Sequence, residues 1–471
     1  MFRGRVRHVH FIGVGGIGMS GIAEILRTMD FDVSGSDLKA SDVTRRLETL
    51  GVRVQIGHKG ENVHGADVVV HSSAIAPNNP ELARARAMEI PAISRGEMLA
   101  ELMRVKYCVT IAGSHGKTTT TSLVATVLRH AGLDPTVVVG GKVNALGSNA
   151  RLGAGDLFVA EADESDGSFL RLAPTVAIIT NIDAEHLDHY GTHENVKDAF
   201  VQFANQVPFY GLCVMCIDHP HVAAILPRLE RRHVTYGTSA KADYRATDVR
   251  FAGIETHFAV HRKTDSLGEF MVRMPGAHNV QNALAVVAAA DELEIPLNIV
   301  REAMAQFHGV QRRFTVLGEP GFEKGGKRGD VMIVDDYGHH PAEIEATLKA
   351  AQSGFGRRVV AAFQPHRYTR THALFAEFTE AFDEADVILV TDVYSAGEKP
   401  IEGATGEALA AGLAARGHPS VRYIAGKENV KDALLEVIEP GDIVIALGAG
   451  DINASARALL ATLTARDKGT P

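Results

Sequence analysis

A glycine turn followed by a lysine and a run of hydroxyl residues is the feature that most constrains this chain. It occupies residues 111–122, Ile-Ala-Gly-Ser-His-Gly-Lys-Thr-Thr-Thr-Thr-Ser, between an expected strand at 107–112 and an expected amphipathic helix at 122–130. Backbone N–H groups of such a turn face phosphate oxygens, a lysine reaches the β- and γ-phosphates, and the next hydroxyl ligates Mg²⁺. The segment predicts a nucleoside triphosphate site that uses Lys117 and Thr118.

The spacing within this turn departs from the general P-loop pattern, which has four residues between its glycines. Only Ser114 and His115 separate Gly113 from Gly116. The segment is therefore an imperfect match to the ordinary P-loop and indicates a narrower family. A plain strand-to-helix turn with a surface lysine is the alternative, but the complete strand, turn and helix context disfavours it.

Length, net charge and apolar content indicate how many domains the chain has and which partners it can bind. At 471 residues the chain is too long for one ordinary core, and about 150 residues per domain predicts three domains. The net charge of −9 argues against a nucleic-acid partner, so anions must be held by local basic groups. No stretch reaches the roughly 18 apolar residues that cross a bilayer, and glycines interrupt the apolar run near the N-terminus. We therefore expect a cytoplasmic protein without a membrane partner.

Strand and helix patterns alternate along most of the chain. Up to about residue 104, the pattern predicts a parallel sheet with helical crossovers. Between 243 and 274 the residues alternate without a helical period, which predicts antiparallel strands. Residues 318–329 read as an exposed loop, and strands separated by helices resume after it.

The predicted fold class is therefore α/β with three domains. We expect a Rossmann-like domain at 1–104 and a central P-loop ATPase domain with mixed and antiparallel strands at 105–315. A Rossmann-like, doubly wound sheet is expected at 316–471.

A second glycine motif lies near the N-terminus. Gly13-Val-Gly15-Gly-Ile-Gly18 fits G-x-G-x-x-G directly after a strand, and Asp37 follows about 20 residues later. Alone, this pattern indicates an NAD-dependent oxidoreductase. A glycine turn at a helix N-terminus nevertheless holds any pyrophosphate, including that of a UDP-sugar. Two nucleotide sites in one chain disfavour the oxidoreductase, which stays open as an alternative.

Acidic and histidine residues follow two further strands of the central part. Glu161 begins the sequence Glu-Ala-Asp-Glu-Ser-Asp after a strand, which is where a ligand for ATP-bound Mg²⁺ is expected. His186 follows another strand and suits a second metal between the γ-phosphate and the acceptor. A solvated acidic loop and a structural histidine are the alternatives.

Polar clusters also follow strands in the C-terminal part, at 335–340, 364–370, 394–398 and 448–451. Ligands of open α/β sheets bind at this edge. His366, Arg367 and Arg370 suit a carboxylate, because guanidinium groups bind carboxylates bidentately.

Together these motifs resemble the Mur ligases, the ATP-dependent amide-forming enzymes of peptidoglycan precursor synthesis. The resemblance covers essentially the whole chain. It rests on Gly-Ser-His-Gly-Lys-Thr-Thr at 113–119, on Glu161 with its acidic loop, on Asn-Ile-x-x-x-His at 181–186, on His278-Asn279-x-x-Asn282 and on Arg313-Phe314. Within the family, residues 10–21, 335–341 and 364–370 resemble the members that join L-alanine to UDP-N-acetylmuramate.

The resemblance implies a reaction with two steps. ATP phosphorylates the lactyl carboxylate of UDP-N-acetylmuramate, and the L-alanine amine then displaces phosphate. ATP and Mg²⁺ are the implied cofactors, and a monomer or weak homodimer is expected. The nearest alternative is a paralogous ligase that attaches a whole peptide to the same UDP-sugar. A nucleotide-switched binding module without turnover is a further alternative.

The resemblance also implies which residues hold each ligand. For ATP we expect Gly113, Ser114, His115, Gly116, Lys117, Thr118, Thr119, Asn279, Asn282, Arg313 and Asp336. Among these, Asn279 and Asn282 would contact adenine, Arg313 phosphate and Asp336 the ribose. The expected metal ligands are Thr118, Glu161 and His186, and the expected catalytic residues are Lys117, His186 and Arg313. For the UDP-sugar we expect Gly15, Gly16, Ile17, Gly18, Ser36, Asp37, Ser72 and Ser73. For the amino acid we expect Tyr337, His366, Arg367 and Arg370 on a C-terminal domain that closes over ATP.

Overall fold

The computed structural model describes residues 6–72, 74–104, 106–139 and 150–467. The chain forms two compact units. Unit 1 contains residues 1–248, 258–271 and 281–310, and unit 2 contains residues 249–257, 272–280 and 311–471. Within the described ranges, no helix combines the length and the apolar character that a bilayer span requires.

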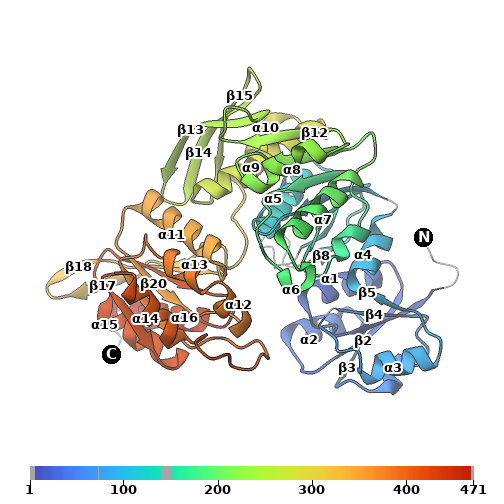
Figure 1. Ribbon diagram of the computed structural model, residues 1–471, viewed down its shortest axis with the longest axis horizontal. Helices are drawn as coiled ribbons and strands as arrows, with labels where there is room; N and C mark the ends of the chain where they lie inside the picture. Colours follow the sequence, from blue (N-terminus) through green and yellow to red (C-terminus); the bar gives the residue numbers. More distant parts are fainter. Residues whose placement is uncertain (1–5, 73, 105, 140–149, 468–471) are drawn as a thin grey trace. The chain divides into compact units, whose positions relative to one another are not determined.

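The N-terminal part of unit 1 is a five-stranded parallel sheet (Figure 1). Its strand order is β3-β2-β1-β4-β5. The strands are β1 (His8–Ile12), β2 (Asp32–Asp37), β3 (Arg53–Ile56), β4 (Val68–His71) and β5 (Ala92–Ser94). The connecting elements are α1 (Ile17–Thr28), α2 (Asp42–Thr49), η1 (Gly60–Val63), α3 (Pro80–Ala87) and α4 (Arg95–Met103). The predicted parallel sheet with helical crossovers is confirmed.

The central sheet has ten strands in the order β15-β14-β13-β12-β11-β10-β6-β9-β7-β8. Its first strands are β6 (Tyr107–Ala112), β7 (Thr136–Val138), β8 (Ala150–Arg151), β9 (Leu157–Glu161) and β10 (Val176–Ile179). The others are β11 (Leu212–Cys216), β12 (His233–Gly237), β13 (Tyr244–Ala252), β14 (Glu255–Arg262) and β15 (Asp265–Val272). Two-residue connections join β13, β14 and β15, so these neighbours run antiparallel, as predicted.

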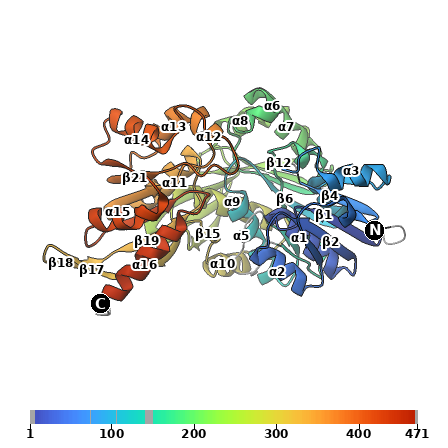
Figure 2. The ribbon, with the colours of Figure 1, turned by 90° about the horizontal axis from the view of Figure 1, so that it is seen from below.

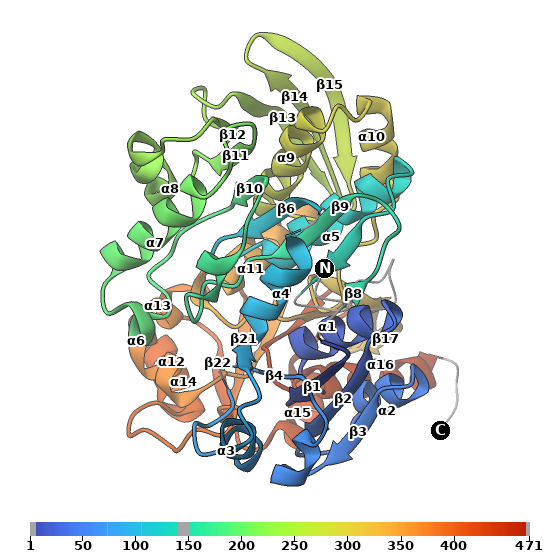
Figure 3. The same cartoon turned by 90° about the vertical axis from the view of Figure 1, so that its right-hand side faces the viewer.

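The helical elements of this part connect the parallel strands. They are α5 (Lys117–His130), η2 (Ser168–Arg171), α6 (Leu187–Tyr190), α7 (His193–Asn205), α8 (Pro220–Ile225), η3 (Leu226–Arg228), α9 (Ala277–Glu292) and α10 (Leu297–Ala305). α4 contacts β4, β5 and η2, and its place near β4 can be followed in Figure 3. Our prediction that α5 starts at residue 122 was wrong, because the threonine run 118–121 forms its first turns and is mostly buried.

The large sheet of unit 2 has six strands in the order β16-β19-β23-β20-β21-β22, and only β16 is antiparallel. The strands are β16 (Thr315–Gly318), β19 (Met332–Asp336), β20 (Val359–Phe363), β21 (Val387–Thr391), β22 (Val421–Ile424) and β23 (Ile443–Leu447). The helical elements are α11 (Pro341–Phe355), α12 (Tyr368–Ala373), α13 (Phe375–Glu380), α14 (Gly406–Ala415), η4 (Lys427–Asn429), α15 (Val430–Val437) and α16 (Asn453–Asp467).

Helices cover both faces of this six-stranded sheet. Figure 2 shows α13 and α14 on one side and α15 and α16 on the other. Side chains of β20 alternate accordingly: Ala361 and Phe363 belong to the apolar cluster of α11, α13 and α14, whereas Val360 and Ala362 belong to that of α15 and α16. The predicted doubly wound sheet is confirmed, and with it the α/β fold class with three domains.

The exposed loop predicted at 318–329 is wrong. Most of it forms a hairpin of β17 (Gly321–Lys324) and β18 (Lys327–Asp330). Gly325 and Gly326 make the two-residue turn with φ of +60° and +77°. A type I′ hairpin turn needs positive φ at both central residues, so the Gly-Gly pair is a hairpin signal that its polar neighbours obscured.

A buried carboxylate on α3 joins this helix to β1, β2 and η1. Glu81 on α3 is fully buried and accepts hydrogen bonds from Ser36 Oγ (2.7 Å), Asn62 Nδ2 (2.6 Å) and the Lys59 N–H (3.1 Å). His10 Nε2 on β1 lies 3.3 Å from the same carboxylate. These groups are far apart in sequence, and a buried charge of this kind is tolerated only when its oxygens are saturated with donors.

We expect Glu81→Gln to lower the free energy of unfolding by about 2–4 kcal/mol near neutral pH, because an amide NH₂ would face donors instead of accepting from them. Burial raises the pKa of Glu81, but hydrogen bonds from His10, Ser36 and Asn62 outweigh burial, so the folded pKa lies below 4.5. The carboxylate's contribution is complete above pH 4.5 and is lost as the pH falls through the folded pKa.

Urea denaturation at a series of pH values measures this effect. The difference between the wild type and Glu81→Gln should shrink below pH 4.5. Glu194→Gln, at a side chain that is 62% exposed, is the control and should change little. A pH-independent difference would contradict the assigned ionisation.

Candidate active site

Three strand ends meet at the triphosphate loop. β6 lies between β9 and β10, with Glu161 paired in register to Ile111 and Ile179 to Ala112. Because all three strands are parallel, the segments that follow them share one edge of the sheet. The structure therefore brings together the glycine turn, the acidic loop that begins at Glu161 and the segment 180–186.

The short glycine turn is held by the segment after β10. The His115 N–H donates to Asn181 Oδ1 (2.7 Å), and Asn181 Nδ2 and Thr180 Oγ1 donate back to the His115 carbonyl (3.0 and 2.7 Å). Gly116, at φ +82°, then leads into α5. With only two residues between its glycines, the turn takes its shape from these external hydrogen bonds.

Lys117 lies over the turn and pairs with the acidic loop. Its ammonium donates to the Ser114 carbonyl (3.1 Å) and the Gly113 carbonyl, and to Glu164 Oε1 at 2.9 Å. Burial lowers the pKa of Lys117, but the charges of Glu164 and Asp163 outweigh burial and hold that pKa above its ordinary value. Lys117 is therefore a fixed cation at the loop.

The acidic loop is compensated by cations. Glu164 is only 2% exposed and pairs with Lys117, so this part of the loop is not solvated. Asp163 Oδ2 accepts from Arg95 Nη2 at 2.8 Å. Burial raises the pKa of Asp163, but the positive charges of Arg95 and Lys117 outweigh burial and keep it far below its usual range.

A histidine and carboxylate cluster flanks the turn on its other side. His115 Nε2 lies 3.2 Å from Asp183 and 3.3 Å from Glu185, and His219 Nε2 lies 3.2 Å from Asp183. Glu185 also lies 3.6 Å from His186 Nε2, and His186 has φ +56°, an uncommon backbone conformation for a residue other than glycine. His186 is thus connected to the triphosphate loop through Glu185 and His115.

The expected metal ligands differ in how well they suit Mg²⁺. Thr118 follows Lys117 in the first turn of α5, and Glu161 is the last residue of β9. Hydroxyl and carboxylate oxygens are the donors that Mg²⁺ prefers, whereas an imidazole such as His186 suits a softer metal. The donor set fits Mg²⁺ at Thr118 and Glu161.

The two asparagines expected at adenine are buried one helical turn apart on α9. Asn282 Oδ1 accepts from Thr120 Oγ1 at 3.1 Å and lies against Gly116, so this asparagine adjoins the triphosphate loop. Asn279 Nδ2 donates to the Pro275 carbonyl at 2.8 Å. Contact of either residue with adenine stays a prediction.

The N-terminal glycine loop is held by the end of β2. The N–H groups of Gly13 and Val14 donate to the Ser36 carbonyl, and the Gly15 N–H donates to Asp37 Oδ2 at 2.8 Å. Asp37 therefore holds the loop itself. Gly16 precedes the first helical residue of α1.

The other residues expected at the UDP-sugar lie at the same sheet edge or outside the described residues. Ile17 is the first residue of α1, and Ser72 directly follows β4. Ser73 lies outside the described residues. Gly18 lies against Arg95, because a Cβ added to Gly18 would be 2.5 Å from Arg95 Nη1.

Sequence reasoning missed Arg95. This arginine directly follows β5, at the sheet edge that also carries the glycine loop. A search of every strand end, including the short edge strand, would have found it. Glu81 was missed as well, and its distant partners give no local signal.

In unit 2, aromatic and imidazole rings form a cluster that includes two residues expected at the amino acid. Tyr337 and His339 ring centroids lie 5.2 Å apart, those of His339 and His366 5.8 Å apart, and His366 stacks on Tyr394 at 5.4 Å. Burial lowers the pKa of both His339 and His366 to about 4, and Arg370 reinforces the shift. Both imidazoles are neutral at pH 7.

The basic residues of this cluster are held by nearby groups. Arg370 Nη1 lies 3.5 Å from His366 Nδ1, and Arg367 Nε lies 4.0 Å from Glu398. Arg367 has φ +70° and precedes α12. The charges of both guanidinium groups act on the neutral His366 imidazole, an arrangement that suits an anionic carboxylate.

The expected phosphate and ribose residues pack against this cluster. Arg313 Nη1 donates to Glu343 Oε1 at 3.1 Å, and its guanidinium lies 5.3 Å from the Tyr337 ring centroid. The Asp336 carboxylate accepts from the N–H groups of Phe314 (2.6 Å) and Gly338 (2.7 Å). The structure thus brings Arg313, Asp336 and Tyr337 together, and their ligands stay predictions.

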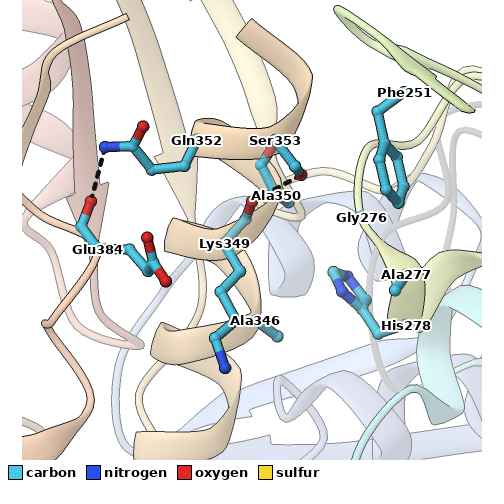
Figure 4. A pocket seen from close by; sticks show the side chains of 10 residues that line it. All are labelled: Phe251, Gly276, Ala277, His278, Ala346, Lys349, Ala350, Gln352, Ser353 and Glu384. Atoms are coloured by element: carbon cyan, nitrogen blue, oxygen red, sulfur yellow. Dashed lines mark hydrogen bonds between the residues drawn. The ribbon is translucent and has the colours of Figure 1, made fainter. Parts of the chain in front are cut away.

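A pocket of about 560 Å³ lies beside the first turn of α9, within unit 2 (Figure 4). It is lined by Phe251, Gly276, Ala277, His278, Ala346, Lys349, Ala350, Gln352, Ser353 and Glu384. Figure 4 shows Phe251 and His278 opposite the side chains of α11. Burial, with the nearby charge of Arg313, lowers the pKa of His278 to about 4, so a neutral imidazole lines the pocket.

The fold and the site define a nucleotide-binding α/β protein with a shortened triphosphate loop and a separate glycine loop. Three family models match it: "Mur ligase family, catalytic domain" over residues 8–107, "Mur ligase middle domain" over 111–290 and "Mur ligase, glutamate ligase domain" over 312–450. The chain belongs to the Mur ligase family, which confirms the predicted resemblance.

Individual members of the family match this chain over almost its whole length. A UDP-N-acetylmuramate–L-alanine ligase from Sorangium cellulosum (strain So ce56) is 65% identical over 469 residues, which cover 99% of this chain and 98% of that protein. The crystal structure of the UDP-N-acetylmuramate-alanine ligase MurC from Thermotoga maritima is 30% identical with a TM-score of 0.79, and covers 98% of this chain and 99% of that one. A murein peptide ligase from Psychrobacter arcticus has the same fold, with 22% identity, a TM-score of 0.69 and coverage of 97% and 99%.

The contact between Gly116 and Asn282 can be tested by comparing Gly116→Ala with Gly132→Ala. Gly116 and Gly132, at the two ends of α5, have φ of +82° and +76°, so alanine strains the backbone equally at both. An added Cβ would lie 2.7 Å from Asn282 Oδ1 at Gly116, whereas no described atom lies within 4 Å of one at Gly132.

We expect Gly132→Ala to cost about 1 kcal/mol of stability and Gly116→Ala at least about 1 kcal/mol more. Only Gly116→Ala should also weaken binding of an ATP analogue, by about tenfold, which corresponds to about 1.4 kcal/mol. Urea denaturation and fluorescence titration measure the two effects. Equal losses in both variants would show that Asn282 does not constrain the loop.

Proposed function

We propose that this chain joins L-alanine to the lactyl carboxylate of UDP-N-acetylmuramate and converts ATP to ADP and phosphate. The observation that carries the proposal is the Lys117–Glu164 pair on a two-residue glycine turn, in a chain 65% identical over its length to a ligase named for this reaction. Such a turn presents a cation and unpaired helix N–H groups to a triphosphate.

ATP binding would use groups that the turn already fixes. The first N–H groups of α5 have no partner inside the helix, and they follow Gly116 directly. Lys117 now donates to two loop carbonyls and to Glu164, and a γ-phosphate oxygen would replace one of these acceptors. Because the pKa of Lys117 is raised, by the charges of Glu164 and Asp163 against the effect of burial, the amine stays charged during this exchange.

The reaction requires an activated carboxyl group. A lactyl carboxylate oxygen attacks the γ-phosphorus, the bond from the γ-phosphorus to the bridging β-oxygen breaks, and ADP leaves with that oxygen. The alanine amine then attacks the acyl carbon, loses a proton, and expels phosphate with the former carboxylate oxygen. Lys117 offsets the charge on the transferring group. Bound Mg²⁺, held by Thr118 and Glu161, would neutralise further phosphate charge.

The other site residues divide between the two remaining substrates. We assign the UDP-sugar pyrophosphate to the N-terminal glycine loop, in a domain of residues 1–104, and ATP to a domain of residues 105–315. Arg367 and Arg370, in a domain of residues 316–471, would hold the alanine carboxylate beside neutral His366. Catalysis then requires the C-terminal domain to close over ATP.

Two alternatives receive less support. An oxidoreductase would use the N-terminal glycine loop and would leave the second glycine turn, with its Lys117–Glu164 pair, without a role. A ligase that adds a whole peptide shares the chemistry, but the murein peptide ligase structure is less similar than the alanine ligase structure.

The central experiment measures phosphate release with ATP, UDP-N-acetylmuramate and each amino acid in turn. L-alanine should give the highest kcat/KM, and UDP-N-acetylmuramate labelled with ¹⁸O in its lactyl carboxylate should transfer one labelled oxygen to phosphate. Formation of AMP and pyrophosphate, or activity only with a peptide acceptor, would refute the proposal.

We expect Lys117→Met to lower kcat by about 10²–10³, because the transition-state charge loses its fixed cation. Lys117→Arg keeps the charge but not the compact ammonium and should also lose most activity. Lys197→Met, at a partly buried lysine of α7 that pairs with Glu194, is the control. An active Lys117→Met enzyme with an unchanged unfolding curve would contradict the assigned role.

A further inference from the structure

Arg95 connects the two nucleotide loops of unit 1. It begins α4, directly after β5, and its side chain is 29% exposed. One guanidinium nitrogen, Nη2, donates to Asp163 Oδ2 at 2.8 Å, and the other, Nη1, lies against Gly18 in the first turn of α1. The guanidinium therefore lies between the N-terminal glycine loop and the acidic loop after β9.

The acidic loop continues this connection to the triphosphate loop. Asp163 interacts electrostatically with both Arg95 and Lys117, and the adjacent Glu164 forms the ion pair with Lys117. One carboxylate is thus shared by two cations. One cation adjoins the loop expected to hold the UDP-sugar, and the other adjoins the loop expected to hold ATP.

A second ion pair joins the same two segments without touching either loop. Arg171 of η2 donates to Glu97 Oε2 at 2.6 Å and to Ser94 Oγ at 3.2 Å, and both charged side chains are about half exposed. Arg95 and Arg171 both link α4 to the segment 163–171, but only Arg95 also contacts Gly18. Arg171 already attaches α4 to this segment, so attachment alone does not explain why Arg95 lies at the glycine loop.

We propose that Arg95 is a positioning residue that couples the occupancy of the two nucleotide sites. This inference rests on the proposed function. A pyrophosphate at the glycine loop attracts the guanidinium and fixes it, and the Arg95–Asp163 hydrogen bond then holds the acidic loop in the geometry that presents Lys117 to ATP. Coupling of binding is reciprocal, so ATP must strengthen UDP-sugar binding by the same factor.

Binding measurements test the coupling without turnover. The Kd of a non-hydrolysable ATP analogue is measured by calorimetry in the full-length enzyme, with and without saturating UDP-N-acetylmuramate and without L-alanine. We expect the UDP-sugar to lower this Kd about tenfold in the wild type. The reverse titration should give the same factor.

The variants separate coupling from structural support. Arg95→Met should reduce the coupling factor to about one, and Arg95→Lys, which keeps the charge without the planar fork, should give an intermediate value. Arg171→Met removes the neighbouring ion pair and should leave the coupling factor unchanged. Asp163→Asn should also lose coupling, and adding it to Arg95→Met should cause no further loss, because both act through one hydrogen bond.

The outcomes distinguish failure of the role of Arg95 from failure of the proposed function. Independent binding of both nucleotides to the wild type, or unchanged coupling in Arg95→Met, would overturn the role of Arg95 and leave the proposed function standing. Equal loss of coupling in Arg171→Met would show that general attachment of α4 is responsible, which also overturns it. Failure of the wild type to bind UDP-N-acetylmuramate at all would instead refute the proposed function.

Discussion

The ion pair between partly buried Lys117 and fully buried Glu164 is the interaction on which the arrangement of this active site depends. A glutamate carboxylate buried as Glu164 is requires a cation beside it, so the acidic loop must stay against Lys117 and the triphosphate loop. The pair brings the end of β9 to the start of α5. Asn181, after β10, holds the turn from the other side. The segments at the ends of β6, β9 and β10 together fix the conformation of the short glycine turn.

Charge compensation of the same kind recurs in both units. Asp163 is shared by Arg95 and Lys117 in unit 1, and Arg313 pairs with Glu343 in unit 2. Two histidines of unit 2 behave in the opposite way: burial and the charge of Arg370 lower the pKa of His339 and of His366 to about 4, so both imidazoles are neutral. A net charge of −9 is therefore compatible with sites for highly anionic substrates, because the cations are concentrated and held where the phosphates and carboxylates would bind.

Much of this structure could be predicted from local sequence pattern. The strand β6 was predicted with its observed bounds, and the parallel sheets at both ends of the chain were predicted as such, because short apolar runs between turn residues mark buried parallel strands. The hairpin β17–β18 was predicted as a loop, because its Gly-Gly turn lies among polar residues. The start of α5 was predicted too late, because its first turns consist of threonines, which are mostly buried.

The candidate site was predictable where its residues belong to recognisable motifs, most of which follow strands. Lys117, Glu161 and His186 met that condition, and they lie at one sheet edge. Arg95 and Glu81 act through partners about 70 residues away, and no local pattern records such a pairing. Tertiary contacts of this kind become visible only when the strand order is known.

The hydrogen bond from Gly15 to Asp37 has a consequence for engineering and evolution of this fold. In this chain one carboxylate oxygen of the acid that follows the glycine fingerprint accepts a hydrogen bond from the glycine loop itself. Redesigning the N-terminal sheet to accept a nicotinamide coenzyme would thus have to keep one Asp37 oxygen on the Gly15 N–H while the other oxygen accepts from a ribose hydroxyl. The G-x-G-x-x-G motif with its following acid therefore predicts the conformation of the loop, but it does not by itself predict which nucleotide the loop binds.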